Sequence, residues 1–262
     1  NAREQFNFSL IESNKESGQN SAKNSPEKET NVKNAVTTTL FFEFLELNLK
    51  QCIKDNMLTN TLKSRIALEV ACGMSHIHKV GMIHRDLRIE NIMLNSVLEA
   101  KIIGLGLDRI AMLIKKGASR DEDSHFKNSL MKDISTFAYM SPELQKDQNY
   151  DAKTDVYSFG VVLHVLFTGK LPKLSLKDKV GGKKAELPDP SESISTFCLG
   201  LIEKCLSFDP SKRPSFDEIL YDMQKNSYSL ANEVDADSIA RRHRALNRFE
   251  SLNIGTPFIS SP

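Results

Sequence analysis

Cysteine is scarce in this sequence, and the four that are present are Cys52, Cys72, Cys198 and Cys205. They form no CxxC pair, and no two of them have the spacing of a zinc site. The sequence also shows no signal peptide, so we expect a reducing, cytoplasmic location. A chain that begins with Asn1 in place of Met is further expected to be a piece of a longer protein.

An excess of charge of either sign is also missing. Lys and Arg total 35 against 34 for Asp and Glu, which leaves a net charge of +1. This balance gives no electrostatic reason to expect nucleic acid or an anionic membrane as a partner. The longest apolar stretch, residues 156–167, is interrupted by Ser158, Gly160 and His164 and is too short to span a bilayer. It is typical of a buried helix.

What is present is an ordinary globular composition, with 40% apolar and 26% charged residues over 262 positions. That length can bury the core of one large domain or of two small lobes. Residues 6–12 alternate apolar and polar side chains as a half-buried strand does, and residues 37–44 are β-branched and aromatic. Between them, residues 13–35 are too polar to offset the entropy of ordering and are predicted to be a disordered insertion.

The rest of the chain has mainly helical patterns. A short helix is predicted at 49–55, and a long amphipathic helix after Thr61 that Gly81 ends. Two short strands, 92–94 and 101–103, join through the Asn95–Ser96 turn, and a polar loop follows at 110–135. Further helices are predicted at 151–167, 193–205, 215–225 and 235–250. Few strands followed by many helices indicate an α+β fold.

The segment from His84 to Asn91 reads HRDLRIEN, which resembles the catalytic loop of protein kinases at every fixed position. The resemblance implies that Asp86 orients the acceptor hydroxyl and takes its proton, and that the amide oxygen of Asn91 holds a magnesium ion. Arg88 stands where serine/threonine kinases usually have lysine, and a cation there can touch the transferring phosphate.

Three later motifs follow in the family's order: TFAYMSPE at 136–143, KTDVYSFG at 153–160 and CLSFDPSKRPSF at 205–216. The last one resembles the closing signature of the tyrosine-kinase-like group of serine/threonine kinases. The resemblance implies that Glu143 pairs with Arg213 and that Asp155 accepts hydrogen bonds from the catalytic-loop backbone. It also implies a remnant of the small lobe at 1–44, a largely complete helical large lobe at 45–226, and a C-terminal helix and tail at 227–262, so that the small lobe is truncated.

The residues LFFEFLE at 40–46 are similar to the last small-lobe strand and hinge of the family. By that resemblance the backbones of Glu43 and Leu45 face the adenine of ATP, and Met93 is a further nucleotide-contacting residue. His76, His78 and His84 lie close in sequence, but they are assigned structural roles because no complete set of metal ligands accompanies them.

The pattern breaks where the family has Asp-Phe-Gly, because this chain has Gly104-Leu105-Gly106. Magnesium is bound through oxygen, usually from carboxylates and phosphates, and glycine offers no side chain. Asp108 lies past the turn and is not expected to replace the missing carboxylate. A Gly-rich loop and a VAIK strand are also not found, so we expect weak binding of ATP and poor retention of Mg²⁺.

These observations favour a pseudokinase-like domain that acts as a scaffold or allosteric module toward a protein partner. Two alternatives stay open. One is a working serine/threonine kinase that phosphorylates a protein substrate with Asp86 as base and Asn91 as metal ligand. The other is a decayed domain that does not fold stably.

Overall fold

The computed structural model describes residues 6–10, 36–40, 43–105, 134–145, 151–173 and 194–253. The chain divides into two compact units, residues 1–44 with 107–126 and residues 45–106 with 127–262. The domain boundaries expected from the sequence motifs, at 44/45 and 226/227, stay a prediction.

The first unit contains an antiparallel pair of strands, β1 (Phe6–Leu10) and β2 (Val36–Leu40), with Phe6 opposite Leu40. Both predicted strands are therefore confirmed in part. The predicted extension of the second strand to Phe44 is wrong, because Glu43 and Phe44 belong to no strand and Phe44 is 63% exposed. Phe41 and Phe42 lie outside the described residues. The predicted insertion at 13–35 lies outside the described residues.

The second unit contains a small antiparallel sheet in the order β3–β4–β5. Its strands are β3 (Leu47–Asn48), β4 (Ile92–Leu94) and β5 (Ala100–Ile102), with Leu47 opposite Leu94 and Ile92 opposite Ile102. The sequence predicted β4 with these bounds and placed β5 one residue too late. It missed β3, which has only two residues and thus no periodicity to detect.

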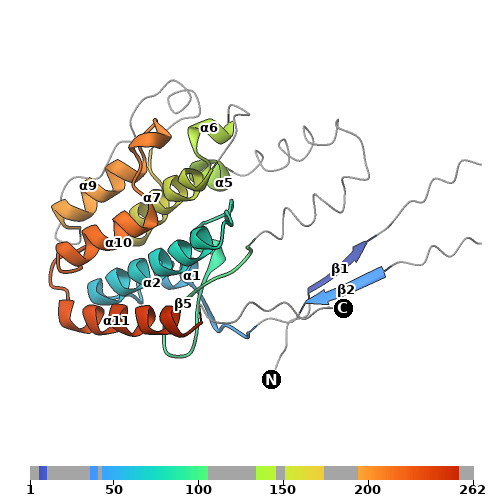
Figure 1. The fold of residues 1–262 in the computed structure, drawn as a ribbon, viewed down its shortest axis with the longest axis horizontal. Coiled ribbons are helices and arrows are strands. Elements are labelled where there is room, and N and C mark those ends of the chain that lie inside the picture. The colour runs from blue at the N-terminus through green and yellow to red at the C-terminus, as the bar shows by residue number, and fades with distance from the viewer. Residues whose placement is uncertain are drawn as a thin grey trace, which may run out of the picture. The chain divides into compact units, whose positions relative to one another are not determined.

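Helices make up most of the described part of the second unit (Figure 1). They are α1 (Leu49–Lys54), α2 (Asn60–Lys79), α5 (Ile134–Tyr139), α6 (Pro142–Gln145), α7 (Ala152–Thr168), α9 (Thr196–Cys205), α10 (Phe216–Lys225) and α11 (Ala236–Asn253), with short 3₁₀ turns η1 (Ile89–Asn91) and η2 (Pro210–Lys212). The predicted loop at 110–135 overlaps α5 at its last two residues, and the rest of it lies outside the described residues.

Side-chain caps fix where these helices begin. The Thr59 hydroxyl accepts a hydrogen bond from the backbone N–H of Leu62 at 3.2 Å, so α2 begins at Asn60 and the start predicted after Thr61 is wrong. The Asp151 carboxylate caps α7 by accepting from Lys153 N at 2.7 Å. Ser215 and Glu218 form a reciprocal capping box at the start of α10.

The core is built around α7. Every residue of this helix from Thr154 to Phe167 is buried, as the sequence predicted for this stretch. Helix α2 packs against α7, α10 and α11, and Figure 1 shows α10, α2 and α11 lying side by side. The α+β prediction is confirmed. In the described part of the chain, no helix is both long enough and apolar enough to cross a membrane.

Candidate functional site

A buried carboxylate in α7 holds the segment that links α2 to β4. Asp155, fully buried, accepts hydrogen bonds from the backbone N–H groups of His84 and Arg85, each at 2.8 Å. Arg85 has a φ of 72°, in the left-handed region that a non-glycine residue seldom adopts. The two bonds to Asp155 therefore support a strained turn directly before Asp86, and the role expected for Asp155 is confirmed.

His78 adds a third contact to this carboxylate. Its Nε2 lies 2.8 Å from Asp155 Oδ2, and its ring meets Phe216 edge-on with centroids 5.1 Å apart. The structural role predicted for His78 is therefore confirmed, but its partner was missed. Asp155 is 77 residues away, and no local pattern reports such a contact.

Asp86 and Asn91 lie together, as the motif predicts. The Asn91 side-chain Nδ2 donates to the Asp86 carbonyl oxygen at 2.8 Å and to the Asp86 carboxylate at 2.6 Å. An amide nitrogen has two hydrogens, so both are directed at Asp86 and Oδ1 is the atom of this side chain left to act as an acceptor or ligand. Asn91 is placed by η1, in which its backbone N–H donates to Arg88 O at 2.9 Å.

Gly104 lies beside the same amide. The backbone N–H of Ile103 donates to Asn91 O at 2.9 Å, and the Ile103 carbonyl lies 3.0 Å from His84 Nε2. A Cβ atom at residue 104 would lie 3.3 Å from Asn91 Nδ2 and 3.6 Å from Oδ1. A side chain at this position would therefore start next to the Asn91 amide, but glycine supplies none.

Arg88, in the same segment, is held by Glu90 and Tyr139. Its Nε donates to Glu90 at 2.8 Å, and its guanidinium lies 5.7 Å from the centre of the Tyr139 ring. Glu90 also pairs with Lys50 at 3.1 Å. Burial raises the pKa of Glu90, but its hydrogen bond to Arg88 and the nearby positive charges outweigh burial and leave it below its usual value. Contact of Arg88 with a phosphate stays a prediction.

The three residues expected to contact a nucleotide are distributed over both units, and their contact with a nucleotide stays a prediction. Glu43 is exposed and belongs to the first unit, whereas Leu45 and Met93 belong to the second. The sulfur of Met93 lies 3.5 Å from Asn48 Nδ2, which also donates to the Glu90 carbonyl at 3.1 Å. Asn48 was missed by the sequence reasoning; its type suits the N-cap of α1 that it forms, but capping does not reveal the bond to Glu90.

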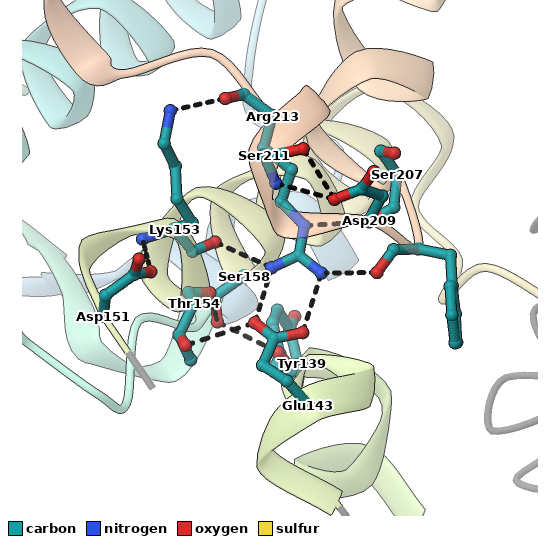
Figure 2. A network of polar contacts seen from close by, with 11 residues as sticks. Tyr139, Glu143, Asp151, Lys153, Thr154, Ser158, Ser207, Asp209, Ser211 and Arg213 are labelled. Atoms are coloured by element: carbon teal, nitrogen blue, oxygen red, sulfur yellow. Dashed lines mark hydrogen bonds and ion pairs between the residues drawn. The ribbon is translucent and has the colours of Figure 1, made fainter. Parts of the chain in front are cut away.

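A buried ion pair connects α6 to the turn after α9, and Figure 2 shows it at close range. Arg213 donates to the two carboxylate oxygens of Glu143 at 2.6 and 2.8 Å, as the motifs predict. It also donates to the carbonyl oxygens of Ser207, Lys153 and Phe208. The guanidinium of Arg213 is thus engaged in structural hydrogen bonds within the second unit. A cavity of about 440 Å³ lies beside it, lined mainly by polar side chains such as Lys153, Lys204 and Lys212.

Metal ligands are not clustered in the parts of the chain that can be described. Among those residues, no group of three or more His, Cys, Asp and Glu side chains is placed to hold a metal ion. Gly106 and Asp108 lie outside the described residues.

Comparison with known proteins gives one consistent result. The family model for the protein kinase domain matches residues 28–223. Receptor-interacting serine/threonine-protein kinase 1 of Homo sapiens is 33% identical over 194 residues, which is 69% of this chain and 29% of that protein. Serine/threonine/tyrosine-protein kinase HT1 of Arabidopsis thaliana is 32% identical over 165 residues, 62% of this chain and 39% of the relative. Dual specificity protein kinase pyk3 of Dictyostelium discoideum is 34% identical over 160 residues, 60% of this chain and 11% of the relative. The chain therefore matches only a minor part of the length of these proteins.

Proposed function

The chain belongs to the protein kinase family, and from that premise we propose that it is a pseudokinase of the tyrosine-kinase-like group, which signals by binding and not by efficient phosphoryl transfer. Its partner is a protein, and its location is cytoplasmic. The observation that carries this proposal is Gly104, which offers no side-chain oxygen beside Asn91.

The side chains at this position do not supply the oxygen ligands with which protein kinases bind magnesium. Magnesium takes oxygen ligands in near-ideal octahedral geometry, usually from one or two carboxylates together with phosphates. Asn91 Oδ1 and residue 104 together supply a single side-chain oxygen. The Asp86 carboxylate, which contacts Asn91, already accepts a hydrogen bond from it at 2.6 Å.

The expected loss of rate is large. A metal ion on the transferring phosphates contributes several kcal/mol of charge stabilisation. Since about 1.4 kcal/mol corresponds to a tenfold change in rate, loss of most of that contribution slows phosphoryl transfer by at least a few hundredfold. Binding of ATP is expected to be weak for the same reason.

The second candidate is a working serine/threonine protein kinase that acts on a protein substrate. The contact between Asp86 and Asn91 favours it, because the expected base and the expected metal ligand lie within hydrogen-bonding distance of each other. Asp155 also keeps the preceding turn in place. In this alternative Asn91 alone holds the metal ion, or manganese takes the place of magnesium.

The two candidates are separated by restoring the carboxylate. Phosphorylation of a generic basic substrate is measured with Mg²⁺ or Mn²⁺ for the parent, Gly104→Asp and Gly104→Asn. The φ of residue 104 is +82°, a conformation that Asp and Asn tolerate better than other side chains, so the Asn variant matches the strain and the shape of Asp without its charge.

We expect low activity in the parent and in Gly104→Asn, and a rise of a hundredfold or more in Gly104→Asp. Robust activity that is equal in the parent and in Gly104→Asp, and that Asp86→Asn removes, would establish the working kinase instead.

A further inference from the structure

The last described helix, α11, lies beyond the segment that the kinase model matches, which ends at residue 223. It packs along α2 with Ile239 fully buried. Two polar contacts hold α11 in place, one directly before its first residue and one near its middle. The backbone N–H of Asp235 donates to the Thr61 hydroxyl at 3.1 Å, and the Tyr228 hydroxyl lies 2.9 Å from Nδ1 of the buried His243. These contacts fix the rotation of α11 about its axis.

That rotation directs Arg242 at two carboxylates from different elements. Its Nε lies 2.7 Å from Glu69 of α2, and its Nη1 lies 2.8 Å from Glu99, between β4 and β5. The Glu69 side chain is only 3% exposed. The planar guanidinium can serve both acceptors at once, which the single ammonium of a lysine does less well.

The second oxygen of each carboxylate accepts a hydrogen bond from the β4–β5 hairpin. Glu69 Oε2 accepts the backbone N–H of Ala100, the first residue of β5, at 2.7 Å. Glu99 Oε2 accepts from the side chain of Asn95, the residue after β4, at 3.0 Å. Arg242 is therefore connected to Ala100 through Glu69 and to Asn95 through Glu99, and these two residues flank the hairpin turn.

The hairpin connects the two residues of the candidate metal position, Asn91 and Gly104. Asn91 directly precedes β4, and Gly104 follows β5 by two positions. The Ile103–Asn91 backbone hydrogen bond, 2.9 Å long, joins the far ends of the two strands. The fit of β5 against α2 leaves little free space, because a Cβ atom at Gly73 would lie 2.9 Å from Ile102 Cδ1.

We propose that α11 is a built-in support for this hairpin, and that Arg242 is the positioning residue through which it sets the geometry of Asn91 and Gly104. Glu69 and Glu99 transmit the effect. The link does not depend on whether the domain catalyses or binds nucleotide.

The burial of Glu69 explains why the link is sensitive to Arg242. Burial raises the pKa of Glu69, whereas the Ala100 N–H, Arg242 and Arg65 act against it. Arg65 Nε is 3.9 Å away, so Arg242 is the close positive partner. Without it the buried carboxylate must take up a proton or move toward water, and either change alters its bond to Ala100.

Amide hydrogen exchange of the nucleotide-free protein tests the proposal. Arg242→Gln is compared with Arg241→Gln, its exposed neighbour on the same helix. We expect the amides of Ala100 and Ile103 to exchange at least tenfold faster in Arg242→Gln, while the Leu199 amide in α9 is unchanged. Arg241→Gln is expected to leave all three at the parent rate. Faster exchange confined to α11, with Ala100 and Ile103 unchanged, would overturn the proposal.

A second variant covers the case in which Arg242→Gln does not fold. The double variant Glu69→Gln with Arg242→Gln removes the buried charge together with its partner, so no charge is left alone. Exchange at Ala100 and Ile103 is expected to stay at least threefold above the parent, because the link to α11 is gone. Parent-like exchange in this variant would show that α11 only docks. Neither measurement involves ATP, so failure here is distinct from failure of the pseudokinase proposal.

Discussion

At the scale of single residues, Arg213 is the most heavily bonded side chain described. It is 1% exposed, and its guanidinium binds both oxygens of Glu143 as well as three backbone carbonyls. A buried ion pair of this kind adds little to stability compared with an apolar pair, but loss of one partner leaves the other charge buried alone. The pair therefore fixes the position of α6, and its removal is costly.

Glu143→Gln is expected to lower the free energy of unfolding by about 3 kcal/mol, because it leaves Arg213 without a counter-charge. Urea denaturation followed by circular dichroism measures the change. Glu46→Gln, which changes an exposed carboxylate, serves as the control and is expected to stay within about 0.5 kcal/mol of the parent. Equal stability of both variants would contradict a structural role for the pair.

The same pair predicts sensitivity to acid. Burial raises the pKa of Glu143, but the hydrogen bond and charge of Arg213 outweigh burial and leave this pKa below its usual value. A carboxyl whose folded pKa is depressed stabilises the fold above its unfolded pKa, about 4.3, and that contribution is lost as the pH falls through the folded pKa. Between pH 6 and pH 3, the parent should therefore lose more stability than Glu143→Gln. Parallel curves for the two proteins would rule this out.

At the scale of elements, the contact between α7 and α9 depends on one glycine. A Cβ atom at Gly160 would lie 2.8 Å from Cys205 Cβ and 3.0 Å from Leu206 Cδ2. Real Cβ atoms do not approach other atoms so closely, so a larger residue would push the end of α9 away from α7. Gly200, within α9, has no such neighbour within 4 Å.

Two substitutions of the same kind should therefore have opposite effects. Alanine favours helix by about 1 kcal/mol over glycine, so Gly200→Ala is expected to raise the free energy of unfolding by up to that amount. Gly160→Ala is expected to lower it by about 1 to 3 kcal/mol, because overpacking exceeds the gain in propensity. Thermal and urea unfolding of both variants measures the difference, and stabilisation by Gly160→Ala would show that α9 can move aside.

The long helices could be predicted from the sequence because their apolar periodicity is strong, whereas their starts depend on competing caps. Thr59 and Thr61 are both suitable N-cap residues for α2. In the structure Thr59 caps the helix, and the Thr61 hydroxyl accepts from the backbone of Asp235, 174 residues away. A contact of that range has no local signature, so the sequence placed the start of α2 two residues late.

In the candidate site, what could be predicted were residues fixed by a motif: Asp86, Asn91 and Asp155, together with the Glu143–Arg213 pair. The sequence reasoning missed Asn48 and Arg242, and it missed the partner of His78. All three residues act through partners in other elements. Their identities are common in any helix or cap. The packing of α2, α7 and α11 gives His78 and Arg242 their roles, and the contact of Asn48 with η1 and β4 gives Asn48 its role.

At the scale of the whole molecule, the hydrophobic core of the described residues lies within the second unit. It extends in sequence from Leu49 to Ile239 and surrounds α7. The first unit contributes the β1–β2 pair, and a two-stranded hairpin is marginally stable at best in water. Stability should therefore be a property of the second unit.

Removal of residues 1–44 is expected to leave a protein that unfolds in a single cooperative thermal transition, with a midpoint close to that of the parent. Near- and far-ultraviolet circular dichroism should report the same midpoint, because one core melts as a unit. A broad transition, or different midpoints for the two signals, would instead support the alternative of a decayed domain without a stable fold.

The backbone at Gly104 makes the loss of the carboxylate easier than its recovery. With a φ of +82°, this residue occupies a conformation that glycine adopts freely and that costs other residues roughly 1 kcal/mol or more. A change from aspartate to glycine at such a position lowers the backbone strain while it removes the side-chain carboxylate, so the change does not cost stability through the backbone. A return from glycine to aspartate would add this conformational cost to the folded state. Binding of nucleotide and metal would have to offset it.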